Sequence, residues 1–169
     1  MSDVGIRTAT ASDVPALNAI YNEYIVGSHV SFDADPWTDD ERLAWFDQRV
    51  ALGYPILVAV INGVVVGSAW SGPWRDKAAY RSSVETTVVV APGHEGAGIG
   101  SALMVGLLDV LAEAGFVLAI AIVALPNDGS IAAHQNLGYT EVGVLRDVGF
   151  KDGRFHDTMI LQRQIAPEA

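Results

Sequence analysis

The sequence predicts a mixed α/β fold in which helices pack on a central sheet, as one domain over residues 1–169. Three observations predict it. Asn62-Gly63 divides "PILVAVINGVVVGSAW" into the two strands of a hairpin. The stretch "SSVETTVVVAP" is rich in β-branched residues, which favour strands. The apolar run Phe116–Leu125 is about half as long as a membrane span and is typical of a strand buried on both faces.

The N-terminal third predicts one strand and two helices. Residues Gly5–Thr10 alternate in polarity and predict the first strand. Ser12 is a favourable N-cap for a helix that ends near Gly27. The capping box "TDDE" at Thr38–Glu41 opens a second helix, which closes at Gly53.

The remaining elements alternate along the rest of the chain. A strand ends at Pro92 and is followed by a helix over about Gly98–Ala114 and by the buried strand. A short helix at Asn127–Leu137 precedes two last strands, near Tyr139–Phe150 and Arg154–Ile165. The predicted order is β-α-α-β-β-β-α-β-α-β-β, which gives a mixed sheet with helices on it.

Composition and charge exclude several classes of partner. Acidic residues outnumber Lys and Arg by 20 to 10, for a formal net charge of −10. Such a chain repels nucleic acid and anionic membranes, so we expect neither as a partner. The chain holds no cysteine, and its first ten residues lack a basic start followed by an apolar stretch. We therefore expect no disulfides, no secretory signal and a cytoplasmic location.

The segment "HEGAGIGSALM", from His94 to Met104, places three glycines at every second position just before a predicted helix. Closely spaced glycines at a helix start let backbone N–H groups face an anion. A dinucleotide loop would need glycine where Ser101 stands and an acid about 20 residues later. A phosphate loop would need a lysine, and none lies between Lys77 and Lys151. A pyrophosphate at the helix start and a tight turn without ligand both remain open.

Several stretches together resemble GNAT-type N-acetyltransferases, and within them the phosphinothricin and methionine sulfoximine N-acetyltransferases. They include "SGPWRDKAAY", "SVETTVVV", "GAGIGSALM", "GVLRDVGFKDGRFHD" and, most specific, "LPNDGSIAAHQNLGY". The resemblance implies a mostly antiparallel sheet with one splayed strand pair, helices on both faces, and acetyl-CoA as co-substrate. It also implies a homodimer and a role in antibiotic or herbicide resistance.

The resemblance assigns the acetyl-CoA contacts to three segments. Backbone groups of the strand would pair with the pantetheine arm, and loop amides would hold the pyrophosphate. Asn127 would contact the cofactor near the thioester. The strand residues are Val88, Val89 and Val90, and the loop residues are Gly96, Ala97, Gly98, Ile99, Gly100 and Ser101.

Two residues of the loop depart from the family pattern. Glu95 stands where relatives carry Arg or Gln, and Ala97 replaces a residue that is often basic. Glu95 therefore offers repulsion to a pyrophosphate. Its alternative role is a favourable interaction with the positive end of the helix, worth about 0.3–1 kcal/mol when exposed. We expect the backbone amides to dominate binding.

Glu85 is the candidate general base, the role that the family resemblance implies at this point of the motif. Burial in the strand would raise its pKa and make it a better base. Acetyl transfer also needs the thioester carbonyl polarised, which we assign to the backbone N–H of Val88. The strand pattern alone equally fits Glu85 as an outward-facing residue with no catalytic role.

His134 is the second catalytic candidate. It occupies the position where many GNAT enzymes place a tyrosine that protonates the leaving thiolate, and the phosphinothricin-type relatives carry histidine there. An imidazole can give or relay a proton near neutral pH. The alternative is a hydrogen-bonded core histidine on the face "IAAHQNL".

The acceptor site is predicted from the cations of "PWRDKAAYR". An arginine fork suits an amino-acid carboxylate, and we favour Arg75, with Lys77 and Tyr80 nearby and Phe32 as an apolar wall. The histidines show no metal-ligand spacing, so we expect no metal.

The leading hypothesis is acetyl transfer to the amine of a small amino-acid-like molecule of the phosphinothricin or methionine sulfoximine and sulfone type. Two alternatives stay open. One is acetylation of peptide or protein N-termini, and the other is a catalytically weak acyl-CoA-binding regulatory module, which Glu95 and Ala97 favour.

Overall fold

The computed structural model describes residues 4–165. The element order agrees with the one predicted, with two short 3₁₀ turns added. The elements are β1 (Gly5–Thr8), η1 (Ala11–Asp13), α1 (Val14–Gly27), α2 (Asp39–Ala51), β2 (Ile56–Ile61), β3 (Val64–Pro73), η2 (Ala78–Tyr80), β4 (Ser83–Val90), α3 (Ile99–Glu113), β5 (Leu118–Ala124), α4 (Asp128–Asn136), β6 (Thr140–Lys151) and β7 (Arg154–Gln164).

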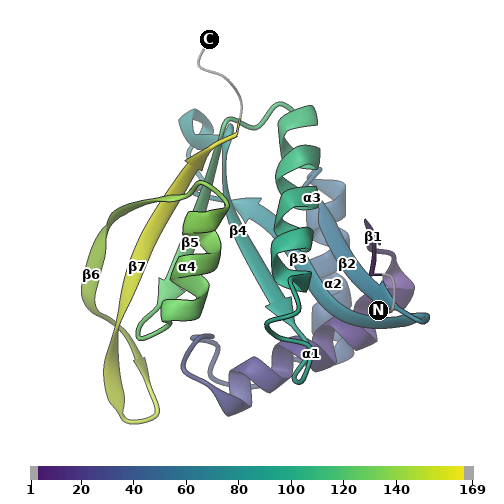
Figure 1. Cartoon of the computed structure of the whole chain (residues 1–169), viewed down its shortest axis with the longest axis horizontal. Coiled ribbons are helices and arrows are strands. Elements are labelled where there is room, and N and C mark those ends of the chain that lie inside the picture. The colour runs from purple at the N-terminus through teal and green to yellow at the C-terminus, as the bar shows by residue number, and fades with distance from the viewer. Residues whose placement is uncertain (1–3, 166–169) are drawn as a thin grey trace.

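One seven-stranded sheet organises these elements, in the order β1-β2-β3-β4-β5-β7-β6. All neighbours run antiparallel except β4 and β5, which run parallel. In Figure 1, α3 and α4 lie in front of the sheet and α2 lies behind it. Helices therefore cover both faces, as the resemblance implied.

Two hydrophobic clusters hold the helices on the sheet. The larger one surrounds α3, whose Leu103, Leu107 and Leu111 are completely buried against β2–β5. The other joins α1 and α2 to the opposite face of the central strands through Leu17, Phe46 and neighbouring residues. Buried apolar area of this kind is the main stabilising term of such a fold.

The β4–β5 pair separates after a short parallel contact. The two strands pair only from Ser83 opposite Leu118 to Glu85 opposite Ile120. Thr86 Oγ1 then donates to Ile120 O over 3.2 Å, and beyond it both strands continue unpaired with each other. The parting of the strands opens one edge of β4 next to the glycine loop.

Two local motifs have the structure that the sequence predicts. Asn62 and Gly63 have φ values of 50° and 82°, which is the hairpin turn that needs positive φ at both positions. The Thr38–Glu41 capping box is closed in both directions, with Thr38 N donating to Glu41 Oε2 at 2.8 Å and Glu41 N to Thr38 Oγ1 at 3.3 Å.

Ser12 is not the helix N-cap, and the first strand ends at Thr8. Thr10 caps a 3₁₀ turn instead, with its N–H donating to Asp13 Oδ2 at 2.8 Å. Asp13 also accepts two hydrogen bonds from Arg7, which lowers the pKa of its carboxyl to about 2. The bidentate pair with Arg7 holds Asp13 at the N-cap of α1, where Ser12 was predicted. A serine hydroxyl cannot form such a charged pair.

The strand predicted to be buried on both faces is only partly so. β5 covers Leu118–Ala124, and Ile122 in its middle is 37% exposed. Ile122 faces the opening left by the parted strands, so a ligand cleft there accounts for its apolar exposure. Residues 4–165 contain no helix with the length and apolarity needed to cross a lipid bilayer.

Candidate active site

A cleft of about 850 Å³ lies where β4 and β5 part. Its walls come from the end of α1 and the segment after it, from β4 and β5, from the glycine loop and from α4. Among the residues that line it are Glu85, Thr87, Val88, Val89, Val90, Glu95, Gly96, Gly98, Gly100, Ser101, Ile122, Asn127 and His134. The structure thus brings together most of the residues predicted to bind acetyl-CoA and both catalytic candidates.

The backbone of β4 presents hydrogen-bonding groups to the cleft at alternate residues. Ala91 N donates to Val66 O on β3, so the N–H groups of Val89 and Thr87 also face β3. The N–H of Val88 therefore points into the opening. Val90 is already engaged, because its carbonyl accepts a 2.7 Å hydrogen bond from Tyr24 Oη.

The glycine loop takes a conformation that requires glycine at two of its three positions. Gly96 and Gly98 have φ values of 74° and 80°, and Gly98 is the N-cap of α3. No atom lies within 4 Å of a Cβ added at either glycine, so the backbone there is open to a ligand. Ala97 is exposed, and Ile99, the first residue of α3, is buried in the larger hydrophobic cluster, so neither side chain lines the cleft.

The Glu95 carboxylate is bonded to the turn that precedes the glycine loop. Its Oε2 accepts a 2.7 Å hydrogen bond from Gly93 N in the preceding turn. The side chain thereby stabilises the loop locally, and it leaves the first amides of α3 free to donate. The expected electrostatic conflict with a pyrophosphate is reduced by this geometry, although Glu95 still lines the cleft.

Glu85 stands at the junction of the cleft with a second, smaller cavity. Its pKa is raised by burial, and the positive charges of Arg49 and then Arg75 oppose that rise. The side chain is half-buried and lines both cavities. A carboxylate with a raised pKa in a cleft is a typical functional-site feature.

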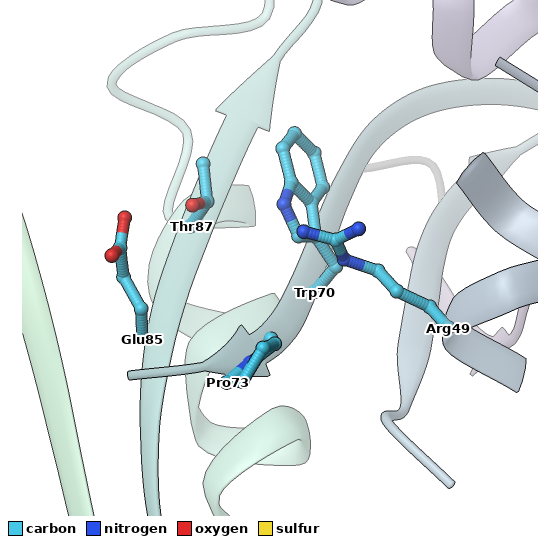
Figure 2. A pocket seen from close by; sticks show the side chains of 6 residues that line it. Arg49, Trp70, Pro73, Glu85 and Thr87 are labelled. Carbon is cyan, nitrogen blue, oxygen red and sulfur yellow. The ribbon is translucent and has the colours of Figure 1, made fainter. Parts of the chain in front are cut away.

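The smaller cavity, of about 100 Å³, lies on the α2 side of β4 (Figure 2). It is lined by Arg49, Trp70, Gly72, Pro73, Glu85 and Thr87. Figure 2 shows the Arg49 side chain reaching from α2 toward the part of the sheet that carries Trp70 and Glu85.

Arg49 is a site residue that the sequence patterns did not single out. A signal was available, because Arg42 and Arg49 are seven residues apart and so share a face of α2, near the buried Phe46. An arginine on the inward face of a helix is a candidate for a buried role.

His134 is buried and held in one orientation. Its Nδ1 lies 2.8 Å from Ser130 O, so Nδ1 carries the hydrogen and Nε2 is an acceptor in the neutral ring. Burial lowers its pKa, and Tyr139 packs edge-on against the ring with centroids 5.1 Å apart. The hydrogen-bonded core histidine and the cleft-lining histidine are here the same residue.

The predicted cofactor contact Asn127 has a structural role. Its Oδ1 accepts a hydrogen bond from Ser130 N and caps α4. The residue also lines the cleft, so the cap fixes the position of any contact that the rest of its amide makes.

The predicted acceptor residues separate in space. Phe32 lines the cleft, whereas Arg75, Lys77 and Tyr80 lie exposed on the segment between β3 and β4 and line neither cavity. Arg75 sits over the ring of Trp74, with its guanidinium carbon 4.9 Å from the centroid. Within residues 4–165, no three His, Asp or Glu side chains come together as a metal site.

Comparison with known proteins agrees with this geometry. Residues 17–139 match the model of the acetyltransferase (GNAT) family. The chain is 44% identical to a phosphinothricin N-acetyltransferase of Streptomyces viridochromogenes over 95% of this chain and 87% of the relative. It is 37% identical to an L-methionine sulfoximine/L-methionine sulfone acetyltransferase of Salmonella typhimurium, over 97% of this chain and 98% of the relative.

A solved structure extends the agreement to three dimensions. The phosphinothricin acetyltransferase of Sinorhizobium meliloti in complex with AcCoA superposes with a TM-score of 0.94 at 32% identity, covering 98% of this chain and 90% of that one. The predictions of a GNAT-like fold, of acetyltransferase activity and of acetyl-CoA as co-substrate are confirmed. The chain therefore belongs to the GNAT family of acetyltransferases.

Proposed function

We propose that the protein transfers the acetyl group of acetyl-CoA directly to the amine of a small amino-acid-like molecule of the phosphinothricin or methionine sulfoximine and sulfone type. The observation that carries the proposal is Glu85, a half-buried carboxylate with a raised pKa at the junction of the two cavities. The activities for which the relatives from Streptomyces viridochromogenes and Salmonella typhimurium are named support the choice of acceptor.

The residues that line the cleft fit acetyl-CoA, the acetyl donor. The loop from Gly96 to Ser101 has open backbone at the start of a helix, which suits a pyrophosphate without basic side chains. The exposed edge of β4 at Val88 suits the amide groups of a pantetheine arm. Bound there, acetyl-CoA supplies the thioester carbonyl that the acceptor nitrogen attacks.

Glu85 accepts the proton that the acceptor ammonium must lose, directly or through one water. The N–C bond then forms, the nitrogen loses its second proton, the C–S bond breaks, and the coenzyme leaves as its thiolate, which takes up one proton. The N–H of Val88 donates to the carbonyl oxygen as negative charge develops on it. The products are the N-acetyl compound, the free thiol and one proton released to solvent.

His134 has a secondary role in this scheme. With its pKa lowered by burial and its only hydrogen on Nδ1, the neutral ring offers an acceptor rather than a proton on the remaining nitrogen. It therefore orients a hydrogen-bond donor near the thiol end of the cleft. Of the other predicted acceptor residues, Phe32 is an apolar wall, and Arg75, Lys77 and Tyr80 stay predictions.

A thiol-release assay with acetyl-CoA tests the function, using phosphinothricin, methionine sulfoximine, methionine sulfone, ordinary amino acids and short peptides side by side. We expect release with the first three. Release with peptides alone would support N-terminal acetylation instead. Coenzyme binding by calorimetry without release for any amine would favour the regulatory module.

The mechanism is tested by Glu85→Gln, which keeps the shape but cannot accept a proton. We expect kcat to fall by about 10²- to 10⁴-fold with little change in KM, since a general base acts in the transition state. His134→Ala is the comparison, with a milder loss expected. Unchanged turnover in Glu85→Gln would remove this residue from the mechanism.

We also propose a homodimer in a cytoplasmic location. Exposed apolar side chains gather on the β6–β7 hairpin, among them Val142, Val148, Phe150 and Phe155. Such a patch marks an association surface. Light scattering should report twice the 17.9 kDa chain mass, and a Phe150→Glu, Phe155→Glu double variant should run as a monomer. A monomeric wild type would contradict the proposal.

A further inference from the structure

Arg49 is a cation on the wall of the small cavity that has no anionic partner. Among residues 4–165 it takes part in no salt bridge, and its Nε is buried without a hydrogen-bond partner. The ring of Trp45 lies 4.4 Å from its guanidinium carbon and supports one face of the group. A buried polar group left unpaired is costly, and the Arg49 guanidinium in addition lines a cavity that a ligand can enter.

The opposite wall of the same cavity carries the opposite charge. Glu85 lies across the cavity from Arg49, and its charge is the largest influence opposing the effect of burial on the Arg49 pKa. The two groups are not within salt-bridge distance. The space between them therefore presents a positive and a negative group to whatever fills it.

The volume limits what that occupant is. The cavity of about 100 Å³ is well above the ~10–15 Å³ that one water needs, so it has room for a small polar group. A carboxylate with its α-carbon is of that size, whereas an amino-acid side chain needs the larger cleft. Glu85 and Thr87 line both spaces, so a molecule can occupy the two at once.

From these observations we infer that Arg49 binds the α-carboxylate of the acceptor in the small cavity. This inference rests on the proposed function. The acceptor is then an α-amino acid bound as a zwitterion, with its carboxylate on Arg49, its ammonium at Glu85 and its side chain in the large cleft. Arg49 takes the specificity role that the sequence suggested for Arg75, which is exposed and lines neither cavity.

The test compares two acceptors that differ only in the carboxylate: L-methionine sulfone and its decarboxylated form, 3-(methylsulfonyl)propan-1-amine. The quantity measured is the ratio of their kcat/KM values. A mutation that affects the fold, coenzyme binding or the base changes kcat/KM for both acceptors, so its effect cancels in this ratio. Loss of the arginine that binds the carboxylate lowers kcat/KM for the amino acid alone.

We expect the wild type to prefer the amino acid, and Arg49→Met to reduce the ratio by about 10- to 100-fold, the range for hydrogen bonds to charged groups. Arg49→Lys keeps the charge and loses the fork, so its ratio should be intermediate. Arg75→Met tests the competing prediction that Arg75 binds the carboxylate, and it should keep the wild-type ratio. Circular dichroism and thermal melts verify folding of each variant.

Two results would overturn the inference: an unchanged ratio in Arg49→Met, or a loss confined to Arg75→Met. Calorimetry with L-methionine sulfone and coenzyme A separates this failure from failure of the proposed function. No thiol release with any acceptor, together with amino-acid binding that Arg49→Met abolishes, would contradict the function and support the carboxylate site. No amino-acid binding by the wild type would overturn the site itself.

Discussion

Arg42 and Arg49 lie two turns apart on the same face of α2, yet their surroundings differ. Arg42 is 1% exposed and enclosed by three aromatic rings, those of Tyr21, Trp37 and Trp45, at 4.5, 4.1 and 4.8 Å from its guanidinium carbon. Arg49 contacts one ring and faces a cavity. Neither arginine has a carboxylate partner among the described residues.

The difference separates a structural cation from a binding cation. Around Arg42 the aromatic faces and Asn18 Oδ1, which accepts from its Nε at 3.3 Å, fill the space that a ligand would need. Around Arg49 that space is left open opposite Glu85. Packing on every side of a buried charge stabilises the fold, whereas an open side leaves the charge for a ligand.

The largest expected effect is on stability. Arg42→Ala should lower the free energy of unfolding by about 3 kcal/mol, because it opens a cavity and removes contacts with three rings. Arg49→Ala should cost about 1 kcal/mol, since it loses one ring contact. Urea denaturation measures both, and Arg42→Met separates lost volume from lost charge. Equal losses at the two sites would contradict the distinction.

The pH dependence of activity should reveal the effect of Arg49 on Glu85. Glu85 must be ionised to accept a proton, so activity falls as pH drops through its pKa. Burial raises that pKa and Arg49 opposes the rise, so Arg49→Met should move the acid limb of kcat/KM to higher pH. Arg75→Met should act in the same direction to a smaller extent. The measurement should use 3-(methylsulfonyl)propan-1-amine, because this acceptor has no carboxylate that could bind Arg49. An acid limb that stays at the wild-type pH in Arg49→Met would argue against an electrostatic interaction between Arg49 and Glu85.

The raised pKa of Glu85 should also affect fold stability. The ionised form that activity needs is the form that folding disfavours. Because the folded pKa of Glu85 lies above its unfolded value, the folded state binds the proton more tightly. The residue therefore favours folding below the unfolded pKa, and that contribution is lost as pH rises through the folded pKa. Glu85→Gln should melt at a higher temperature than wild type at pH 7, and the gain should shrink on acidification. A lower melting temperature at pH 7 would contradict the raised pKa.

The smallest effect is expected from Gly72→Ala. A Cβ at Gly72 would lie 3.0 Å from Nη2 of Arg49, so the guanidinium must shift by a few tenths of an ångström. We expect KM for the amino acid to rise by about two- to five-fold without loss of stability. Gly143→Ala, a strand glycine with no atom within 4 Å of the added carbon, is the matched control. Equal KM values for the two variants would show that Arg49 tolerates the shift.

Local signals were sufficient for most elements and failed where a competing contact or the sheet geometry intervened. The Asn62-Gly63 turn and the Thr38–Glu41 capping box depend on a few neighbouring residues and formed as predicted. Ser12 failed as an N-cap because Asp13 bonds to Arg7 on the preceding strand. The exposure of Ile122 could not be foreseen either, since it follows from strands that part only in the folded sheet.

The order of elements and the glycine loop at a helix start could be predicted from the sequence, because they follow from periodicity and backbone conformation. The family was indicated by the resemblance of several stretches to known acetyltransferases. Three features depend on the tertiary structure: Glu85 lines two cavities, Glu95 bonds to Gly93, and Arg49 rather than Arg75 lines the small cavity. Charge and burial around a side chain are set by residues far away in sequence, so local patterns do not encode them. Arg49 of α2 and Glu85 of β4, for example, line one cavity although they are far apart in the chain.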